Sequence, residues 1–88
     1  MRVEFLSKFD RDLEEILEPS IRRAILEVVI KVEEASKLHQ IPQLKKLQGF
    51  KYAYRIRVRD YRIGIFVENN IVQFARIKNR RDIYRVFP

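Results

Sequence analysis

Four arginines crowd into one short stretch in the second half of this 88-residue chain. They are Arg55, Arg57, Arg59 and Arg62, within YRIRVRDYRIGIF at residues 54–66. Arginine presents a planar fork of donors and keeps its charge, so it binds phosphates or carboxylates but cannot accept a proton as a general base. The stretch therefore predicts a face that binds an anion, such as a phosphate backbone or the carboxylates of a partner chain.

The spacing of these arginines predicts how their side chains are arranged. Apolar and polar residues alternate on both sides of Arg59-Asp60, which is typical of two antiparallel strands joined by a tight turn. With a loop of two or four residues, Arg57 lies across from Arg62 and Arg55 across from Gly64. Like charges facing each other cost about 0.2 to 1 kcal/mol, which bonding to an anion would offset. A three-residue loop would break this register, and the alternative interpretation is a solvated face on which arginine stems cover apolar surface.

A second cationic group lies near the end of the chain, in KNRRDIYRVF. It contains Lys78, Arg80, Arg81, Tyr84 and Arg85. An aromatic ring beside guanidinium groups suits single-stranded RNA, because the cations bind phosphates and a base can stack on the ring. On spacing alone, Tyr84 is equally compatible with a half-buried core residue whose hydroxyl reaches water.

The charge is divided unevenly along the chain. Residues 1–44 hold seven Lys/Arg and nine Asp/Glu, a net charge of −2, whereas residues 45–88 hold twelve and three, a net charge of +9. This basic half favours a polyanionic partner, either nucleic acid or an acidic protein. The alternative is a basic surface that has no specific partner.

Other classes of site and location are excluded by composition. The chain has no cysteine and a single histidine, His39, so we expect no disulfide, no metal site and no other cofactor. The start, MRVEFLSKFD, lacks the apolar run of a signal peptide, and no segment approaches the roughly 20 apolar residues of a membrane span. We therefore expect a cytoplasmic protein.

The first half of the chain predicts a short strand and two helices. Residues 2–6 alternate as an edge strand does. Ser7 then opens a weak capping-box match with Asp10, and the helix that follows is expected to end near Glu18. Pro19 suits the first turn of a second helix, whose apolar residues recur at helical spacing to about Leu38.

The second half predicts a sheet. After a connecting segment at residues 41–49, the strands are residues 50–58, 61–67, 71–77 and a last short strand, DIYRVF, at residues 82–87, with Asn69-Asn70 as a further turn. Residues 1–88 therefore form a single domain of the α+β class. We expect a helical hairpin on one face of an antiparallel sheet of three to five strands.

Three segments together resemble one known family. KKLQGFKYAYRIRVRDYRIGIF, IVQFARI and NRRDIYRVF are similar to segments of the RelE/ParE superfamily of toxins from type II toxin–antitoxin systems, and the resemblance runs over nearly the whole chain. The family fold, two helices packed on an antiparallel sheet, agrees with the arrangement derived from the periodicity. RelE-like members are ribosome-dependent endoribonucleases (mRNA interferases) that cut mRNA in the decoding site. ParE-like members share the fold but inhibit DNA gyrase and generally lack the catalytic residues.

The resemblance implies which residues act. The positions that match the catalytic set of the RelE branch are Arg55, Arg57, Arg62, Lys78, Arg80 and Tyr84. Further RNA contacts are expected from Lys51, Arg59, Arg76, Arg81 and Arg85. This complement favours the nuclease branch, in which a ribose 2′-hydroxyl attacks the adjacent phosphate without a metal ion.

The resemblance leaves few candidates for the general base. Relatives often carry lysines where this chain has Arg55 and Arg57, and many carry a histidine where it has Asn79. Tyr84 remains the best candidate, because neighbouring cations would lower the pKa of its phenol, and Lys78 is the second.

Two other functions and one partner also follow from the resemblance. The chain could be a ParE-like inhibitor of DNA gyrase, or an inactive relative that only binds its antitoxin. In each case we expect a cognate antitoxin, with an acidic or amphipathic segment that covers the arginines or docks against the helices. Operator DNA would be bound only through the antitoxin complex, and no membrane partner is expected.

Overall fold

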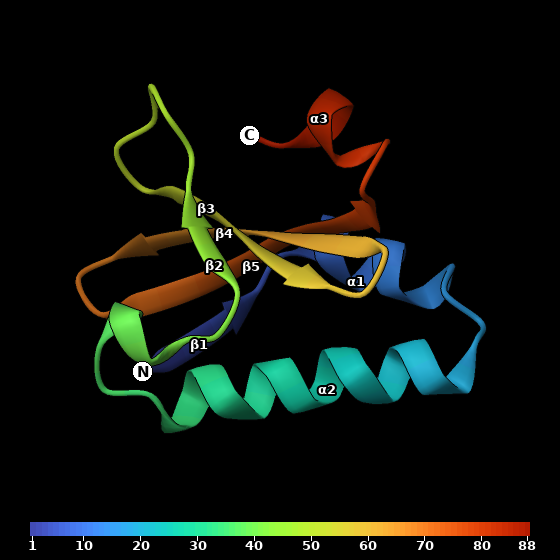
Figure 1. The fold of residues 1–88 in the computed structure, drawn as a ribbon, viewed down its shortest axis with the longest axis horizontal. Coiled ribbons are helices and arrows are strands. Elements are labelled where there is room, and N and C mark those ends of the chain that lie inside the picture. Colours follow the sequence, from blue (N-terminus) through green and yellow to red (C-terminus); the bar gives the residue numbers. More distant parts are fainter.

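A five-stranded sheet with the strand order β1-β5-β4-β3-β2 forms the centre of the molecule (Figure 1). The computed structural model describes residues 1–88. Helices cover both faces of the sheet, with α2 along one face and the short α3 on the other. The predicted α+β class and the predicted range of three to five strands are confirmed.

The three longest strands form the predicted meander. They are β3 (Ala53–Val58), β4 (Tyr61–Glu68) and β5 (Ile71–Asn79). Val58 pairs with Tyr61 across a two-residue turn, in which Arg59 has a φ of 55°. Asn69 and Asn70 have φ values of 53° and 63°, the left-handed pair that a primed hairpin turn requires. Both predicted turns are confirmed.

Two short strands complete the sheet. β2 (Leu44–Lys46) pairs antiparallel with β3, and β1 (Arg2–Phe5) pairs parallel with β5. The predicted edge strand at the start of the chain is therefore present, but its direction makes the sheet mixed rather than wholly antiparallel. The chain passes from β1 through two helices to β2 at the opposite edge, and the antiparallel strands β2 to β5 then return to β1, where β5 runs in the same direction as β1. β2 falls in the segment predicted to be only a connection, since three residues are too few to show an alternating pattern.

Helix α2 (Pro19–Glu34) lies along one face of the sheet (Figure 1). It begins at Pro19 as predicted but ends at Glu34, about one turn before the predicted end near Leu38, and a short 3-10 turn, η1 (Leu38–Gln40), follows. Its buried residues Ile21, Ile25, Val29 and Val32 belong to the main core, which fills the space between α2 and the sheet. No helix in the structure has the length and apolar character of a membrane span.

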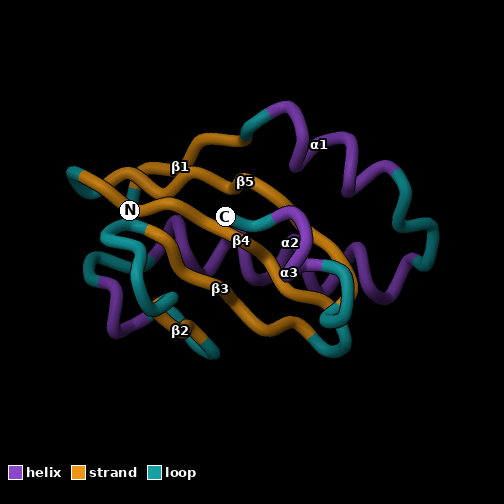
Figure 2. Tube along the Cα trace, turned by 90° about the horizontal axis from the view of Figure 1, so that it is seen from above, coloured by secondary structure: helices purple, strands orange, loops and turns teal.

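Helix α1 (Ser7–Glu14) packs mainly on β5, beyond the end of β1 (Figure 2). Its Phe9 ring is buried, with its centroid 5.5 Å from that of Phe74 on β5. The predicted capping box is wrong, because Ser7 is already inside the helix and Leu6 occupies the N-cap without a side-chain hydrogen bond. The helix also ends at Glu14 rather than near Glu18.

The predicted last strand is wrong, since this segment forms helix α3 (Ile83–Val86) on the sheet face opposite α2 (Figure 1). The backbone N–H of Phe87 donates to the carbonyl of Ile83 at 2.9 Å, a helical spacing. Ile83, Val86 and Phe87 face the sheet together. Their spacing fits one helical face, but six residues are too few to separate it from alternation.

Candidate functional site

An open pocket of about 370 Å³ lies where β2, β3, β4 and α3 meet. We call it the basic pocket, because four of its lining residues are cationic and none is acidic. The lining residues are Gln43, Leu44, Lys45, Arg55, Arg57, Arg62 and Tyr84. This composition attracts an anion.

The hairpin places three arginines in this pocket. The register pairs Arg57 with Arg62 and Arg55 with Gly64, as the sequence predicts. Ile56 on β3 and Ile63 on β4 are fully buried on the side of α2, so the residues next to them point to the opposite face. The hydrophobic pattern of the core thus decides that the arginines share one outer face.

The charge of the basic pocket is not neutralised within the chain. Ion pairs form only where Arg76 and Lys78 meet Asp12 and Glu15, outside the pocket. Arg62 is held instead by main-chain carbonyls, with its Nη1 donating to Arg59 at 3.0 Å and to Tyr61 at 2.9 Å. These bonds orient the guanidinium and leave its positive charge for a ligand.

Tyr84 reaches the pocket from α3. Its side chain is exposed, and the Arg55 Cζ lies 4.6 Å from the centroid of its ring, in cation–π geometry. The Arg55 guanidinium, through its donor groups and its charge, lowers the pKa of the Tyr84 phenol, and Lys45 and Arg62 add to this effect. The cations that could bind a phosphate therefore also favour the phenolate form of Tyr84, which is the form that can accept a proton.

Two of the predicted site residues, Arg76 and Lys78, form ion pairs outside the basic pocket. The Arg76 Nε is 2.8 Å from the Asp12 Oδ2, and the Lys78 Nζ is 3.3 Å from the Asp12 Oδ1 and 3.4 Å from the Glu15 Oε2. Partial burial would lower the pKa of Lys78, but hydrogen bonds and charge from the two carboxylates outweigh it and raise that pKa. Lys78 therefore stays protonated in this ion pair.

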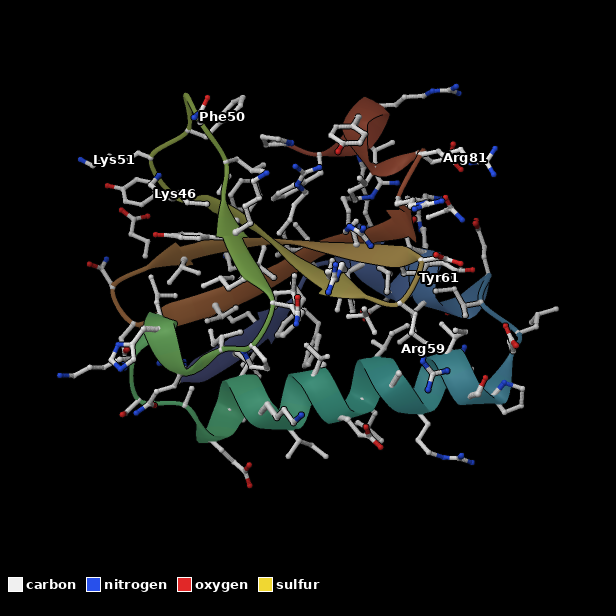
Figure 3. All side chains as sticks on the ribbon, in the orientation of Figure 1. Lys46, Phe50, Lys51, Arg59, Tyr61 and Arg81 are labelled. Atoms are coloured by element: carbon white, nitrogen blue, oxygen red, sulfur yellow. The ribbon has the colours of Figure 1, made fainter.

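The other predicted cations are exposed and do not line the basic pocket. Figure 3 shows Lys51 in the loop before β3, Arg59 at the β3–β4 turn and Arg81 beyond the end of β5. Arg80 precedes Arg81, and its backbone N–H donates to the Asp60 carbonyl at 2.8 Å, which ties the end of β5 to the β3–β4 turn. Arg85 is exposed on α3. Of the six residues predicted to be catalytic, the structure brings Arg55, Arg57, Arg62 and Tyr84 together.

The sequence interpretation missed three residues of the basic pocket, Gln43, Leu44 and Lys45. Lys45 pairs with Arg55 across β2 and β3, which brings another cation to the same face. The two adjacent lysines in IPQLKKLQG are the signal in the sequence that could have indicated this additional cation. A prediction of strand at Lys45 would have placed its side chain beside Arg55.

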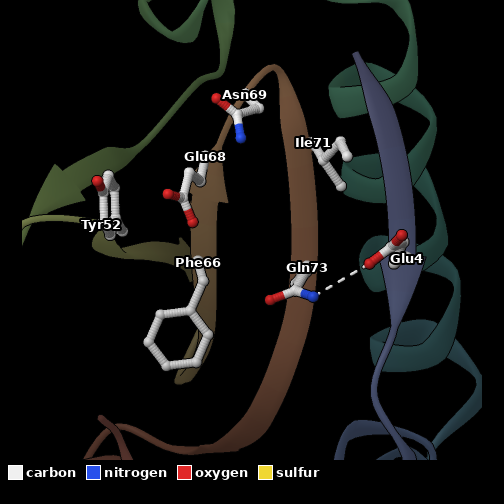
Figure 4. Close-up of a pocket in the computed structure, with 7 residues that line it drawn as sticks. All are labelled: Glu4, Tyr52, Phe66, Glu68, Asn69, Ile71 and Gln73. Atoms are coloured by element: carbon white, nitrogen blue, oxygen red, sulfur yellow. Dashed lines mark hydrogen bonds between the residues drawn. The ribbon is translucent and has the colours of Figure 1, made fainter.

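A second pocket, of about 420 Å³, lies near the other end of the sheet (Figure 4). Its lining includes Glu4 and Glu68, with the Gln73 Nε2 donating to the Glu4 Oε1 at 3.0 Å. Two carboxylates repel a phosphate. This pocket therefore lacks the positive charge with which the basic pocket attracts an anion.

No protein-family model matches the chain. Among curated proteins, the chain is similar to Toxin RelE3 of Methanocaldococcus jannaschii, with 35% identity over 89 residues that cover 100% of both chains. The likeness extends over the whole length, including β3, β4 and α3, which form the basic pocket.

Solved structures share the fold. A RelB-RelE antitoxin-toxin complex from Methanococcus jannaschii matches with a TM-score of 0.81 and 33% identity, over 96% of this chain and 98% of that chain. An archaeal RelE-RelB complex from Pyrococcus horikoshii matches with a TM-score of 0.73 and 23% identity, over 90% and 93% of the two chains. The second match supports the fold alone.

Proposed function

This chain belongs to the RelE family of toxins of toxin–antitoxin systems, and from this membership we propose that it is a ribosome-dependent mRNA endoribonuclease. One observation carries the proposal. An exposed tyrosine with a lowered pKa stands over an arginine in a pocket that holds four cations and no carboxylate. Such a pocket can bind a phosphodiester and take a proton from the group that attacks it.

The proposed reaction is an internal transesterification. The 2′-oxygen of a ribose bonds to the adjacent phosphorus as the bond from phosphorus to the 5′-oxygen breaks. The products are a 2′,3′-cyclic phosphate and a free 5′-hydroxyl. The phenolate of Tyr84 takes the 2′-proton, and the departing 5′-oxygen takes a proton from water while an arginine neutralises its developing charge.

The arginines stabilise the transition state. Extra negative charge develops on the phosphoryl oxygens, where Arg55, Arg57 and Arg62 are already oriented by the hairpin. Preorganised charges of this kind need no reorganisation during the reaction. The lowered pKa of Tyr84 increases the fraction of phenolate, and positioning of the mRNA by the ribosome adds to the rate.

The cations outside the basic pocket have other roles in the proposal. Lys51, Arg59, Arg80, Arg81 and Arg85 are exposed and bind the phosphates of the flanking RNA. Lys78 and Arg76 act indirectly, because their ion pairs with Asp12 hold α1 on β5.

We also propose a cognate antitoxin. The solved relatives named above are complexes of a toxin with its antitoxin. An acidic segment of such a partner would cover the basic pocket and exclude mRNA. Operator DNA would then be bound by the complex, through the antitoxin.

The test uses purified protein, ribosomes programmed with a defined mRNA, and mapping of the new 5′ ends. We expect cleavage inside the codon in the decoding site and none on the same RNA without ribosomes. An Arg11→Ala variant, which removes an exposed arginine of α1 that does not line the basic pocket, should cleave like the wild type. Growth arrest without any cleavage would reject the nuclease and point to a gyrase supercoiling assay instead.

A further inference from the structure

Gly64 leaves a gap in the outer face of the sheet, and an aromatic ring from the end of the chain fills it. A Cβ atom at residue 64 would lie less than 3.0 Å from three atoms of the Phe87 ring. Real Cβ atoms essentially never come this close to another side chain. The Phe87 ring therefore rests directly on the backbone of β4, which no residue other than glycine permits without movement.

The same contact anchors α3. Phe87 is only 6% exposed, and its ring centroid lies 5.0 Å from that of Phe66. Ile83, one helical turn earlier, is fully buried and forms a cluster with Phe87 and the small side chains of Ala53 and Ala75. This second core is separate from the main core beneath the sheet.

The geometry links this anchor to the basic pocket. Gly64 lies directly across from Arg55 in the β3–β4 pairing. Tyr84 is on α3 between the two anchors Ile83 and Phe87, and its exposed ring stands over the Arg55 guanidinium. The Tyr84 side chain is exposed and has few packing contacts of its own. The position of α3 on the sheet therefore determines where the Tyr84 ring lies.

We propose that Gly64 and Phe87 are positioning residues of the basic pocket, whose contact sets the place of Tyr84 relative to Arg55. Neither residue touches the RNA. The kinetic part of this inference rests on the proposed nuclease function, whereas the structural part does not. A displacement of about 1 Å at a reacting group can cost about 100-fold in rate, so a methyl group at residue 64 is enough to matter.

The first test measures the ionisation of Tyr84 directly. The protein is labelled at the tyrosine ring carbons, the phenol signals are followed by NMR against pH, and Tyr84 is assigned with a Tyr84→Phe variant. In the wild type the proximity of Arg55 keeps this pKa below the usual value of about 10. In Gly64→Ala and in Phe87→Ala we expect the pKa to rise toward the usual value. Val28→Ala, which removes half-buried apolar volume from the main core, should leave it unchanged.

The second test asks whether the two residues act through each other. If Gly64→Ala acts by displacing the Phe87 ring, the substitution should have no further effect in a Phe87→Ala background. A full additional shift of the Tyr84 pKa in the double variant would overturn the proposal. So would an unchanged pKa in both single variants. If Gly64→Ala does not fold, as judged by its amide spectrum, Phe87→Ala against Val28→Ala decides the question.

Cleavage assays then separate this inference from the proposed function. We expect kcat on programmed ribosomes to fall about 100-fold in Gly64→Ala and Phe87→Ala, with KM nearly unchanged, because binding by the arginines persists. A wild type that does not cleave would reject the nuclease but leave the titration result standing. A cleaving wild type whose positioning variants shift the Tyr84 pKa without losing kcat would reject the kinetic part of the inference.

Discussion

Tyr84 is the residue on which the proposed chemistry depends. The other charged groups of the basic pocket are lysine or arginine, and arginine cannot take a proton at physiological pH. The Tyr84 hydroxyl is the one group in the basic pocket that is exposed and has a lowered pKa.

Tyr84→Phe should remove cleavage while leaving the pocket intact, because phenylalanine keeps the ring over Arg55. Loss of a general base typically costs about 100- to 10,000-fold, and we expect a loss in this range in single-turnover assays on programmed ribosomes. Ribosome binding, measured by co-sedimentation, should be unchanged. Cleavage at the wild-type rate would show that the phenol is not the base.

The pH dependence of cleavage should report the influence of Arg55 on Tyr84. Since the phenolate is the active form, the rate rises with pH up to the lowered pKa of Tyr84 and then levels off. Arg55→Ala removes the principal cause of that lowering and should move the rise to higher pH. Arg57→Ala, which removes a pocket cation that does not shift this pKa, should reduce the rate without moving the profile. The prediction fails if both variants give the same profile.

For individual residues, the sequence predicted the positions that follow from the alternation of apolar and polar residues along a strand. Arg55, Arg57 and Arg62 lie where period-two spacing puts them. The partners of Lys78 and Arg76 could not be predicted, because Asp12 is 64 residues away from Arg76 and no local pattern links them.

At the scale of elements, Asp12 holds α1 against the edge of β5. Its carboxylate is 5% exposed and accepts hydrogen bonds from the Arg76 Nε at 2.8 Å and from the Ile77 backbone N–H at 3.0 Å. Burial alone would raise the pKa of Asp12, but these bonds, the bond from Lys78 and the charge of Arg76 outweigh it and lower that pKa.

Asp12→Asn should destabilise the fold by about 1 to 3 kcal/mol at neutral pH, as measured by urea unfolding, because it leaves buried donors poorly paired. A folded-state pKa below the unfolded value gives stability that is complete above the unfolded pKa of about 3.9 and is lost as pH falls through the folded pKa. The difference between the wild type and Asp12→Asn should therefore shrink in acid. Asp10→Asn, an exposed carboxylate on the same helix, is the matched control, and an equal effect there would contradict this role.

Which elements were predictable depended on their length. The strands β3, β4 and β5 each show several alternations, and α2 shows four turns of apolar spacing. β2 and α3 have three and four residues, so their patterns fit either a strand or a helix. The parallel direction of β1 depends on the whole path through α1, α2 and β2 to β5, so it has no local signal.

At the scale of the whole molecule, the fold gathers charge on one face. The net charge of +9 in residues 45–88 belongs to the segment that forms β2 to β5 and α3, whereas α2 covers the opposite face. This arrangement favours long-range attraction of RNA or of an acidic antitoxin.

Binding of a short single-stranded RNA should weaken steeply with salt, because each phosphate contact releases a counterion. Arg57→Ala should reduce the slope of log K against log salt by about one, measured by fluorescence anisotropy. Arg11→Ala, with the same change in net charge, should leave the slope unchanged. Equal slopes for the two variants would mean that net charge, rather than the basic pocket, binds the RNA.

The central claim is that the basic pocket cleaves mRNA by attack of a 2′-hydroxyl. The most direct measurement is single-turnover cleavage on ribosomes whose mRNA carries one 2′-deoxynucleotide on the 5′ side of the mapped scissile phosphate. The account predicts that this mRNA binds but stays uncut, whereas an mRNA with the substitution one nucleotide away is cut normally. Cleavage of the deoxy-substituted bond at the normal rate would contradict it.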